Sequence, residues 1–211
     1  MKITIIYDNT AWDINLKSDW GFSCLVEAFG KNILFDTGAK ANILFYNMKK
    51  LNIDPLKIDE VFISHSHWDH TGGLSYFLNL NPVTVYIPES FALSDDKVNV
   101  VKVNKKRKLH DNIYSTGELK RIEHSLVIKE NTSVTVIAGC SHPGVREILN
   151  AASEMGKVTT LIGGLHGFNE FHLIDNLENI CPTHCTRFIQ KIKDLYPGKT
   201  IEGGAGRVII T

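Results

Sequence analysis

Apolar residues recur along the chain at two spacings, and each spacing predicts one kind of element. Strict alternation of apolar and polar residues is typical of a half-buried β-strand. Lys2 to Tyr7 predicts such a strand, and the segment FSCLVEAFGKNILFDTG (residues 22–38) predicts a β-hairpin that turns at Gly30. Further strands, rich in β-branched residues, are expected at 60–64, 82–88, 98–103, 112–117, 124–130, 132–139, 157–164, 199–204 and 206–211.

Apolar residues three or four positions apart predict helices. Such spacing predicts a helix over residues 39–51 and another over 71–80, with Thr71 as its cap. Two more helices are expected over 143–155 and 186–195. Because strands dominate and no repeat or linker divides the chain, we predict a single domain over residues 1–211. Its class is α/β (α+β), with β-sheets that carry helices on their outer faces.

The composition is that of an ordinary globular protein, with 43% of the 211 residues hydrophobic and 22% charged. Lys plus Arg equals Asp plus Glu, at 23 each, so we expect no nucleic-acid partner and no anionic membrane. The basic run from Lys102 to Lys108 is interpreted as a solvated loop or edge strand rather than a phosphate-binding patch.

The amino terminus MKITIIYDNT is charged too early for a signal peptide. No apolar run approaches the about 18 residues of a membrane span, so we expect a cytoplasmic protein without membrane contact. In that compartment the four cysteines are expected to be reduced thiols: Cys24, Cys140, Cys181 and Cys185.

Candidate chemistry concentrates in one stretch, SHSHWDHTGG, which begins at Ser64. On an extended backbone, side chains at positions i and i+2 point the same way, so His65 and His67 can close on one cation. Asp69 and His70 follow one short turn later and can face a second cation. Imidazole and carboxylate suit zinc, iron or manganese, and the absence of cysteine among these four argues against a purely structural site. We therefore interpret the stretch as a metal site and not as a group of surface histidines.

With this stretch the chain resembles the metallo-β-lactamase-fold superfamily over nearly its whole length. The motifs that carry the resemblance are LFDTG with Asp36, HSHWDH at residues 65–70, VIAGCSHPG with His142 and ICPTHCTR with His184. The runs YDN, WGFS, IGGLH and PTHCT are similar to a narrower subgroup. That subgroup is labelled as similar to ribofuranosylaminobenzene 5'-phosphate synthase, or as metal-dependent hydrolases of β-lactamase superfamily II.

The resemblance implies an αββα sandwich, two mixed β-sheets with helices outside. It also implies two sets of metal ligands, with His65, His67 and His142 for a first cation and Asp69, His70 and His184 for a second. Asp36 would accept hydrogen bonds behind the metal loop and so fix ligand orientation.

The sequence departs from the resemblance at one position. Many two-metal members carry a bridging aspartate between the last two histidines, but here the corresponding strand ends in Gly163 and Gly164, with His166 following. Three alternatives remain open: water or substrate alone bridges the cations, the second site is weak, or His166 has a role of its own.

Several other residues allow two interpretations. His166 either reaches the cleft as an acid or anion donor or is an ordinary loop histidine. Asp8 and Asn9 either line the cleft or form a turn after the first strand. Cys140 and Cys185 are expected to be buried or cleft-edge thiols and not a zinc knuckle.

The tryptophans and the remaining histidines have simpler interpretations. Among the tryptophans only Trp68, inside the metal loop, is informative, and it is expected to pack as a core or cleft-wall residue. Surface positions are expected for His110, His124 and His172.

The predicted activity is hydrolysis of a small-molecule ester, lactone or phosphodiester. One or two divalent cations, zinc in the first place and iron or manganese as alternatives, would activate water and stabilise the developing oxyanion. Asp69 would orient the attacking hydroxide as well as bind metal, and His166 would assist the leaving group. Long nucleic acids are not expected as substrates because the basic surface they require is missing.

Two other functions stay open. The same fold could serve an iron-dependent redox enzyme or a biosynthetic transferase or synthase, and the identity of the metal discriminates these from a hydrolase. A degenerate ligand-binding module would have lost ligands, whereas six of the seven expected positions remain. The oligomeric state is not predicted.

Overall fold

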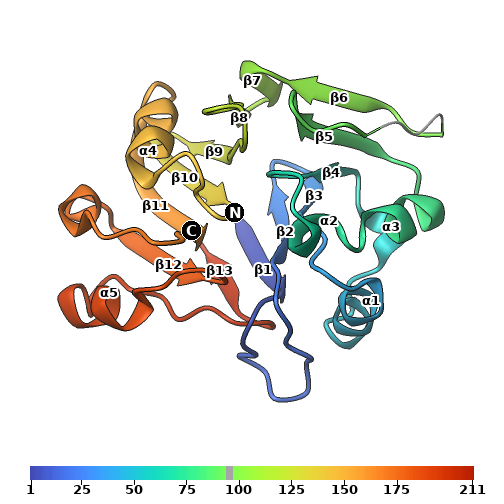
Figure 1. Cartoon of the computed structure of the whole chain (residues 1–211), viewed down its shortest axis with the longest axis horizontal. Coiled ribbons are helices and arrows are strands. Elements are labelled where there is room, and N and C mark those ends of the chain that lie inside the picture. Colours follow the sequence, from blue (N-terminus) through green and yellow to red (C-terminus); the bar gives the residue numbers. More distant parts are fainter. Residues whose placement is uncertain (94–96) are drawn as a thin grey trace.

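The computed structural model describes residues 1–93 and 97–211, whose strands form two facing β-sheets (Figure 1). The strands of the first sheet are β1 (Lys2–Tyr7), β2 (Ser23–Ala28), β3 (Lys31–Phe35), β4 (Glu60–Phe62), β5 (Thr84–Pro88), β6 (Val100–Val103) and β13 (Val208–Ile210). Those of the second sheet are β7 (Lys105–His110), β8 (Ile113–Gly117), β9 (Leu126–Glu130), β10 (Ser133–Ala138), β11 (Lys157–Gly164) and β12 (Asn179–Thr183).

Among the described residues the first sheet has seven strands in the order β13-β1-β2-β3-β4-β5-β6, and the second has six in the order β12-β11-β10-β9-β8-β7. Both sheets are mixed. In the first, β1 and β2 pair antiparallel whereas β3, β4 and β5 run parallel. In the second, β9 and β10 pair antiparallel whereas β10, β11 and β12 run parallel.

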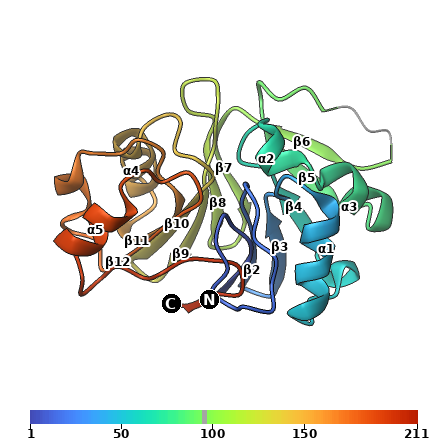
Figure 2. The same ribbon diagram turned by 60° about the horizontal axis from the view of Figure 1, so that its bottom comes forward.

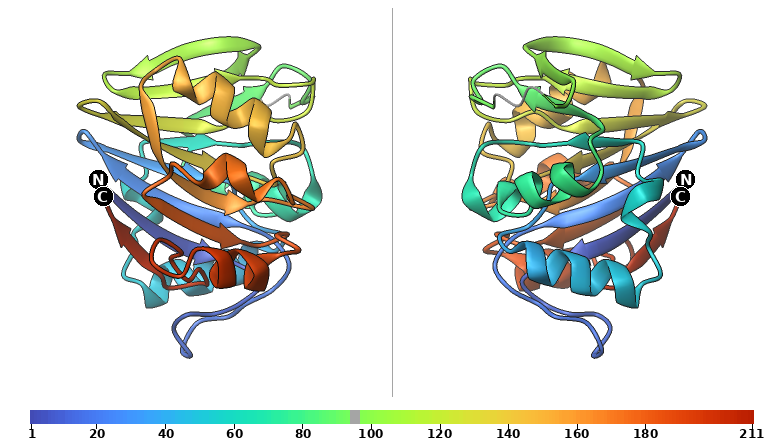
Figure 3. Two further views of the ribbon diagram at one scale, coloured as in Figure 1. Left: turned by 90° about the vertical axis from the view of Figure 1, so that its left-hand side faces the viewer. Right: turned by 90° about the vertical axis from the view of Figure 1, so that its right-hand side faces the viewer.

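Four helices of the described residues cover the outer faces of the two sheets (Figure 2): α1 (Ala41–Lys50), α3 (Leu74–Leu80), α4 (Val145–Ser153) and α5 (Ile189–Leu195). The short helix α2 (Trp68–Thr71) lies instead in the loop after β4, and single 3₁₀ turns occur at Pro55–Lys57 and Phe171–Ile174. Figure 3 shows α4 and α5 in front of the second sheet on one side, and α1 and α3 in front of the first sheet on the other. The αββα sandwich expected from the sequence is confirmed.

Three apolar layers stabilise this arrangement. Between the sheets, Val26 and Phe35 of the first pack with Ile128 and Ile137 of the second in one buried cluster. Outside the first sheet, α1 and α3 bury apolar residues such as Met48 against the strands, and α4 and α5 do the same outside the second sheet. Removal of this apolar surface from water is the main force that joins the layers.

Some of the predicted elements differ from the structure at their ends. Thr71 is the last residue of α2 and its hydroxyl donates to His67 O, so it does not cap α3, which begins after Gly73. The strand expected over 199–204 is reduced to one isolated bridge at Thr200. The basic run contributes to β7, an edge strand with exposed lysines, as interpreted from the sequence.

The parallel strands direct their carboxyl ends to one edge of the sandwich. Because β1, β3 and β4 run the same way in the first sheet, and β10, β11 and β12 do so in the second, the loops that follow them are neighbours. Ligand sites of open α/β sheets lie at such edges. No helix of the described residues is both long and apolar enough to span a membrane.

Candidate metal centre

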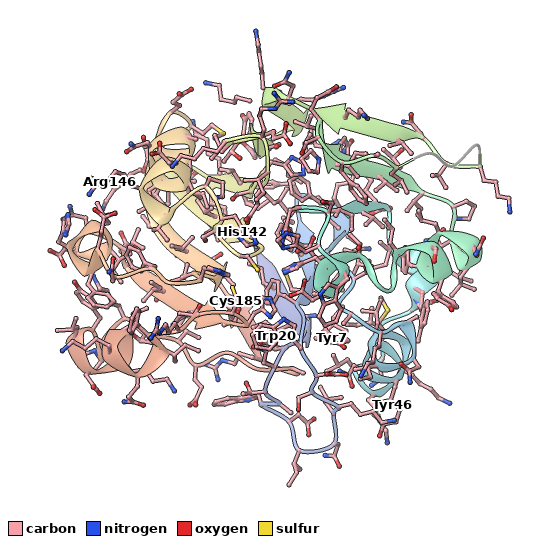
Figure 4. All side chains as sticks on the ribbon, viewed as in Figure 1. Tyr7, Trp20, Tyr46, His142, Arg146 and Cys185 are labelled. Atoms are coloured by element: carbon pink, nitrogen blue, oxygen red, sulfur yellow. The ribbon has the colours of Figure 1, made fainter. Side chains whose placement is uncertain are left out.

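The side chains predicted as metal ligands meet between the two sheets at this edge. The loop and short helix after β4 carry His65, His67, Asp69 and His70, whereas His142 follows β10 and His184 follows β12. Figure 4 shows His142 in the middle of the molecule, between the ribbons of the two halves. The first sheet therefore supplies four of these side chains and the second sheet two.

Three histidines form the first cluster. The ring centroids of His65 and His67 are 4.5 Å apart, and His142 lies 4.8 Å and 4.7 Å from them. The Nε2 atoms of His65 and His142 are buried and have no hydrogen-bond partner among the described residues. A buried imidazole nitrogen without a partner is costly, and a cation would satisfy both atoms.

Asp69, His70 and His184 form the second cluster. His184 Nε2 lies 3.2 Å from His70 Nε2 and 3.3 Å from Asp69 Oδ2, and His70 Nε2 lies 3.8 Å from the same oxygen. Distances of 3.2–3.8 Å among two imidazole nitrogens and a carboxylate oxygen are typical of three ligand atoms around one cation. Donor atoms bound to one tetrahedral zinc ion at about 2.0 Å are about 3.3 Å apart.

Asp36 orients ligands in both clusters. Its Oδ2 accepts a hydrogen bond from His70 Nδ1 at 2.7 Å and another from Ser64 Oγ at 2.7 Å. Ser64 Oγ also lies 2.9 Å from His65 Nδ1. Because the hydroxyl proton of Ser64 is donated to Asp36, its oxygen accepts the proton of His65 Nδ1. Both rings therefore turn the lone pair of Nε2 towards the site. The expected position of Asp36 behind the metal loop is what the structure shows.

His184 is held by the loop after β1. Asn9 Oδ1 is 3.0 Å from His184 Nδ1, and Asn9 Nδ2 donates to His184 O. The buried carboxylate of Asp8 accepts from the backbone N–H of His184 at 2.9 Å. Asp8 and Asn9 thus do more than terminate the strand: they fix the ring so that Nε2 faces Asp69 and His70.

The electrostatics of the clusters favour cation binding. Burial, together with the neighbouring histidines, lowers the pKa of His142 to about 4, so its imidazole is neutral and able to bind metal at pH 7. Burial opposes ionisation of Asp69, but the hydrogen bond with His184 and the charge of His70 outweigh it and lower the pKa of this carboxyl. Burial likewise opposes protonation of His70, yet the carboxylate of Asp36 raises its pKa, which reflects a more basic ring.

A buried carboxylate that the sequence did not reveal shapes the loop after β10. Glu123 Oε1 accepts hydrogen bonds from the N–H groups of Gly139, Cys140 and Ser141 at 3.0–3.1 Å, and Oε2 accepts from His142 N at 2.8 Å. Burial raises the pKa of Glu123 to about 7, and these backbone donors act in the opposite direction. The loop that carries His142 is therefore wrapped around one side chain.

Residues in the left-handed region recur where strands enter the site. Asp36, Ser141, His166 and His184 have φ angles of 52°, 59°, 48° and 51°. Non-glycine residues adopt this region at a cost of about 1–3 kcal/mol, and such strain clusters at functional sites. Each of these residues follows a strand that ends at the site edge, so the strained turns surround the candidate centre.

Trp20 is the tryptophan that touches the site, contrary to the expectation that only Trp68 is informative. Its Nε1 donates to Asp69 Oδ2 at 2.9 Å, and its ring lies 5.3 Å from that of His184. Trp68 is 63% exposed, so it is not a core residue. Trp20 begins the run WGFS, which contributes to the resemblance to the narrower subgroup, but no spacing in the sequence links it to Asp69.

The remaining histidines separate into three environments. His166 is exposed, and its ring centroid is 4.9 Å from that of His142, which places it at the open side of the first cluster. His110 is half-buried and contacts the Glu60 carboxylate at 2.7 Å. The expected surface position is wrong for His124, which is fully buried between the sheets, and correct for the exposed His172.

All four cysteines are free thiols, as expected. Cys140 is 3% exposed, and its Sγ lies 3.2 Å from His70 Nε2. A hydrogen bond with Cys185, and then burial, raise the pKa of Cys140. Cys140 is therefore a buried thiol, one of the two alternatives expected from the sequence, and it lies within the candidate centre itself.

The residues present fit a metal centre. Three imidazole rings have their Nδ1–H groups committed to oxygen acceptors, and two buried Nε2 atoms lack partners among the described residues. His65, Cys140 and His142 form one group, and His70, Cys140 and His184 a second, with all ligand atoms of each group within 4.8 Å of one another. Beside the first group a pocket of about 240 Å³ is lined by His142, His166 and the residues around Gly167.

Comparison with known proteins agrees with this geometry. A model of the Metallo-beta-lactamase superfamily matches residues 21–135, more than half of the chain. A relative in Methanocaldococcus jannaschii, the 7,8-dihydropterin-6-methyl-4-(beta-D-ribofuranosyl)-aminobenzene-5'-phosphate synthase, is 27% identical over 88% of this chain and 87% of its own.

Solved structures share the fold over the whole chain. Tm1679, a metal-dependent hydrolase of the beta-lactamase superfamily, superposes with a TM-score of 0.82 at 24% identity, covering 100% of this chain and 99% of its own. Zn²⁺-bound PqqB from Methylobacterium extorquens superposes with a TM-score of 0.71 at 12% identity, covering 100% of both chains. These likenesses establish the architecture around the clusters.

Proposed function

Since the chain belongs to the metallo-beta-lactamase superfamily, we propose that it is a metal-dependent hydrolase of a small molecule. The observation that carries the proposal is the pair of adjacent ligand clusters, in which buried imidazole nitrogens converge without protein partners among the described residues. We assign His65, His67 and His142 to a first cation and Asp69, His70 and His184 to a second. Zinc is the favoured metal because imidazole nitrogen and carboxylate oxygen ligands suit it, with iron and manganese as alternatives.

Divalent cations bound here would supply a nucleophile at neutral pH and a Lewis acid for a carbonyl or phosphoryl oxygen. The chain's own residues do the rest. Asp69, held by the Trp20 N–H, presents a second carboxylate oxygen that can orient an attacking water. The substrate enters through the open side, where His67 and His166 are exposed and His142 is half-buried.

His166 is assigned to the leaving group. Its ring stands beside His142 at the mouth of the pocket, so its Nδ1 or Nε2 can donate a proton to an oxygen that departs from the reacting centre. The substrate is proposed to be an ester, lactone or phosphodiester of a small molecule. Equal numbers of acidic and basic residues, 23 each, support a small substrate over a long nucleic acid.

Elemental analysis of the purified protein and a panel of ester, lactone and phosphodiester substrates test the proposal. We expect one or two zinc ions per chain and turnover of at least one substrate class. His67→Ala should lose the first cation and all activity, because it removes one of the three proposed ligands. His67 is the exposed member of the first cluster, so the substitution should leave the fold intact. The exposed His172→Ala variant is the control and should keep both metal and turnover. Full turnover by folded His67→Ala would contradict the assignment.

A second candidate function is favoured by one observation, the 27% identity to a ribofuranosylaminobenzene-phosphate synthase over most of both chains. A synthase or an iron-dependent enzyme on this fold would use the same ligands. Redox-active iron in the purified protein, with no hydrolysis of any panel substrate, would favour this second candidate over the first.

A further inference from the structure

A sulfur atom lies between the two ligand clusters. Cys140 Sγ is within 4.8 Å of ligand atoms of His65 and His142, and equally of those of His70 and His184. We propose that Cys140, as a thiolate, is a ligand shared by both cations, in place of the aspartate that β11 lacks. This inference rests on the proposed function, since it requires both cation positions.

The structure shows why a side chain from β11 cannot take this place. A Cβ atom added to Gly164, at the end of β11, would lie 2.4 Å from Gly139 O, 2.8 Å from Cys185 Sγ and 3.2 Å from Cys140 Cα. Real Cβ atoms do not approach other heavy atoms closer than about 3.0 Å. The loop after β10, together with the thiol of Cys185, therefore fills the space that an aspartate at residue 164 would need.

The position of the sulfur is fixed by its backbone. The N–H of Cys140 donates to Glu123 Oε1 at 3.0 Å, and Ser141 Oγ donates to Gly164 O at 2.7 Å. His70 Nε2, 3.2 Å from Cys140 Sγ, has its other ring nitrogen committed to Asp36, so its lone pair faces the sulfur. In the metal-free chain the S–H of Cys140 can donate to this nitrogen, and a cation that replaces the proton would find both donor atoms at a spacing that fits one coordination shell.

A second observation points independently to a ligand at the first cluster. His65 is fully buried, and its Nε2 has no hydrogen-bond partner among the described residues although Cys140 Sγ lies within 4.8 Å. A cation bound by His65 and His142 would also lie within reach of this sulfur. One thiolate therefore serves both positions.

Binding of the cations by Cys140 releases one proton. The S–H bond of Cys140 breaks, bonds form from sulfur to the two cations, and the proton passes to solvent. A shared thiolate favours thiophilic cations such as zinc, iron(II) and cobalt(II) over magnesium, calcium or manganese, which prefer oxygen ligands. The site is therefore expected to discriminate among divalent cations by softness.

Titration of the metal-free protein with cobalt(II) tests the proposal. Ligand-field absorption reports binding to histidines, and near-ultraviolet sulfur-to-cobalt charge-transfer absorption reports a Co–S bond. We expect charge-transfer absorption to grow through both the first and the second equivalent. In Cys140→Ser it should be absent, and affinity for the second equivalent should fall by more than about 100-fold, because loss of an outer-shell partner alone costs about 10–100-fold.

Cys185→Ser is the matched control, because this thiol is a neighbour of Cys140 and is assigned no cation. It should keep the charge-transfer absorption of the original protein. Zinc X-ray absorption of the unsubstituted protein gives a second readout that does not depend on a variant's folding: a sulfur scatterer at about 2.3 Å.

Three results would overturn the shared ligand while leaving the proposed metal centre intact. They are ligand-field bands without charge transfer, charge transfer that saturates at one equivalent, and charge transfer that survives in Cys140→Ser but is lost in Cys185→Ser. Failure of the protein to bind cobalt or zinc at all would instead overturn the proposed function, and this inference with it.

Discussion

At the residue scale, one buried carboxylate controls ligands of both proposed cations. Asp36 accepts directly from His70 Nδ1 and, through the hydroxyl of Ser64, fixes His65. Since an imidazole binds metal through the nitrogen that carries no proton, the acceptor at Nδ1 decides that Nε2 is the ligand atom. Asn9 does the same for His184 with an amide oxygen.

Asp36→Asn tests this control. The amide keeps the size of the side chain, but its NH₂ group cannot accept the protons of His70 Nδ1 and Ser64 Oγ that now meet at Oδ2. We expect metal affinity to fall about 10–100-fold, the usual cost of losing such an outer partner. Competition with a chromophoric chelator measures it. Asp59→Asn is the control, because Asp59 is exposed and, within residues 1–93 and 97–211, its carboxylate accepts only from the backbone N–H of Asn32. Equal affinities in the two variants would refute the role of Asp36.

The sequence predicts ligands that are local in a motif better than partners that are not. His65, His67, Asp69 and His70 share one short stretch, and their spacing alone places them together. The contact of Trp20 with Asp69 spans 49 positions, and no periodic pattern marks it. Such long-range contacts depend on how the sheets pack, which single-sequence reasoning does not fix.

At the element scale, the loop after β10 is organised around one carboxylate. Four successive N–H groups, from Gly139 to His142, point to the carboxylate of Glu123. Convergent backbone donors of this kind form an anion-binding concavity, and here the anion is a side chain. The loop's shape, and with it the direction of the Cys140 and His142 side chains, thus depends on a residue from another loop.

Glu123→Gln is expected to loosen this loop. A glutamine offers one acceptor oxygen, and its NH₂ group would face backbone N–H donors that need an acceptor. We expect the free energy of unfolding to fall by about 1–3 kcal/mol and metal affinity to weaken with it, because a buried N–H is left unpaired. Urea unfolding measures the first and chelator competition the second.

The control for this substitution is Glu154→Gln, which changes an exposed glutamate whose only charged partner in the described part of the chain is Lys106. Its stability should stay within about 0.5 kcal/mol of the original protein. If Glu123→Gln were as stable as this control and bound metal equally well, the loop would not depend on the carboxylate.

The elements themselves were largely predictable where the pattern is local. In the hairpin of residues 22–38, Cys24 and Val26 face the inter-sheet core while Leu25 faces the helices, and Phe29 and Gly30 turn with positive φ angles of 49° and 74°. Helix ends were less predictable. Thr71 is a residue type that often caps helices, but here, at the end of the preceding short helix, its hydroxyl donates to His67 O. The geometry of the metal loop overrides the local preference.

At the scale of the whole molecule, the centre exists only when the two sheets are docked. His142 and His184 come from the second sheet and the other proposed ligands from the first. His124 is a buried link between the sheets close to the centre. Its Nε2 donates to Ile63 O at 2.8 Å, its Nδ1 lies 2.9 Å from Ser115 Oγ, and its ring stacks on Phe62 at 4.1 Å.

His124 makes the docked sandwich sensitive to acid. Burial lowers its pKa from 6.5 to about 3, so between these values the unfolded chain binds a proton that the folded chain does not. The contribution to stability is complete above pH 6.5 and is lost as the pH falls towards 3. The slope reaches about 1.4 kcal/mol per pH unit inside that window.

His124→Gln removes the titrating group while keeping a donor and an acceptor. We expect the variant to be less stable at neutral pH by about 1–3 kcal/mol, from imperfect hydrogen bonds, yet to lose less stability on acidification. Urea unfolding between pH 6.5 and about 3 measures both the stability at neutral pH and its loss on acidification. The proteins are kept metal-free, so that the ligand histidines contribute equally to each curve. His172→Gln, at an exposed position, should follow the original protein throughout. Parallel curves for His124→Gln and the original protein would show that burial of this imidazole does not tie sheet docking to pH.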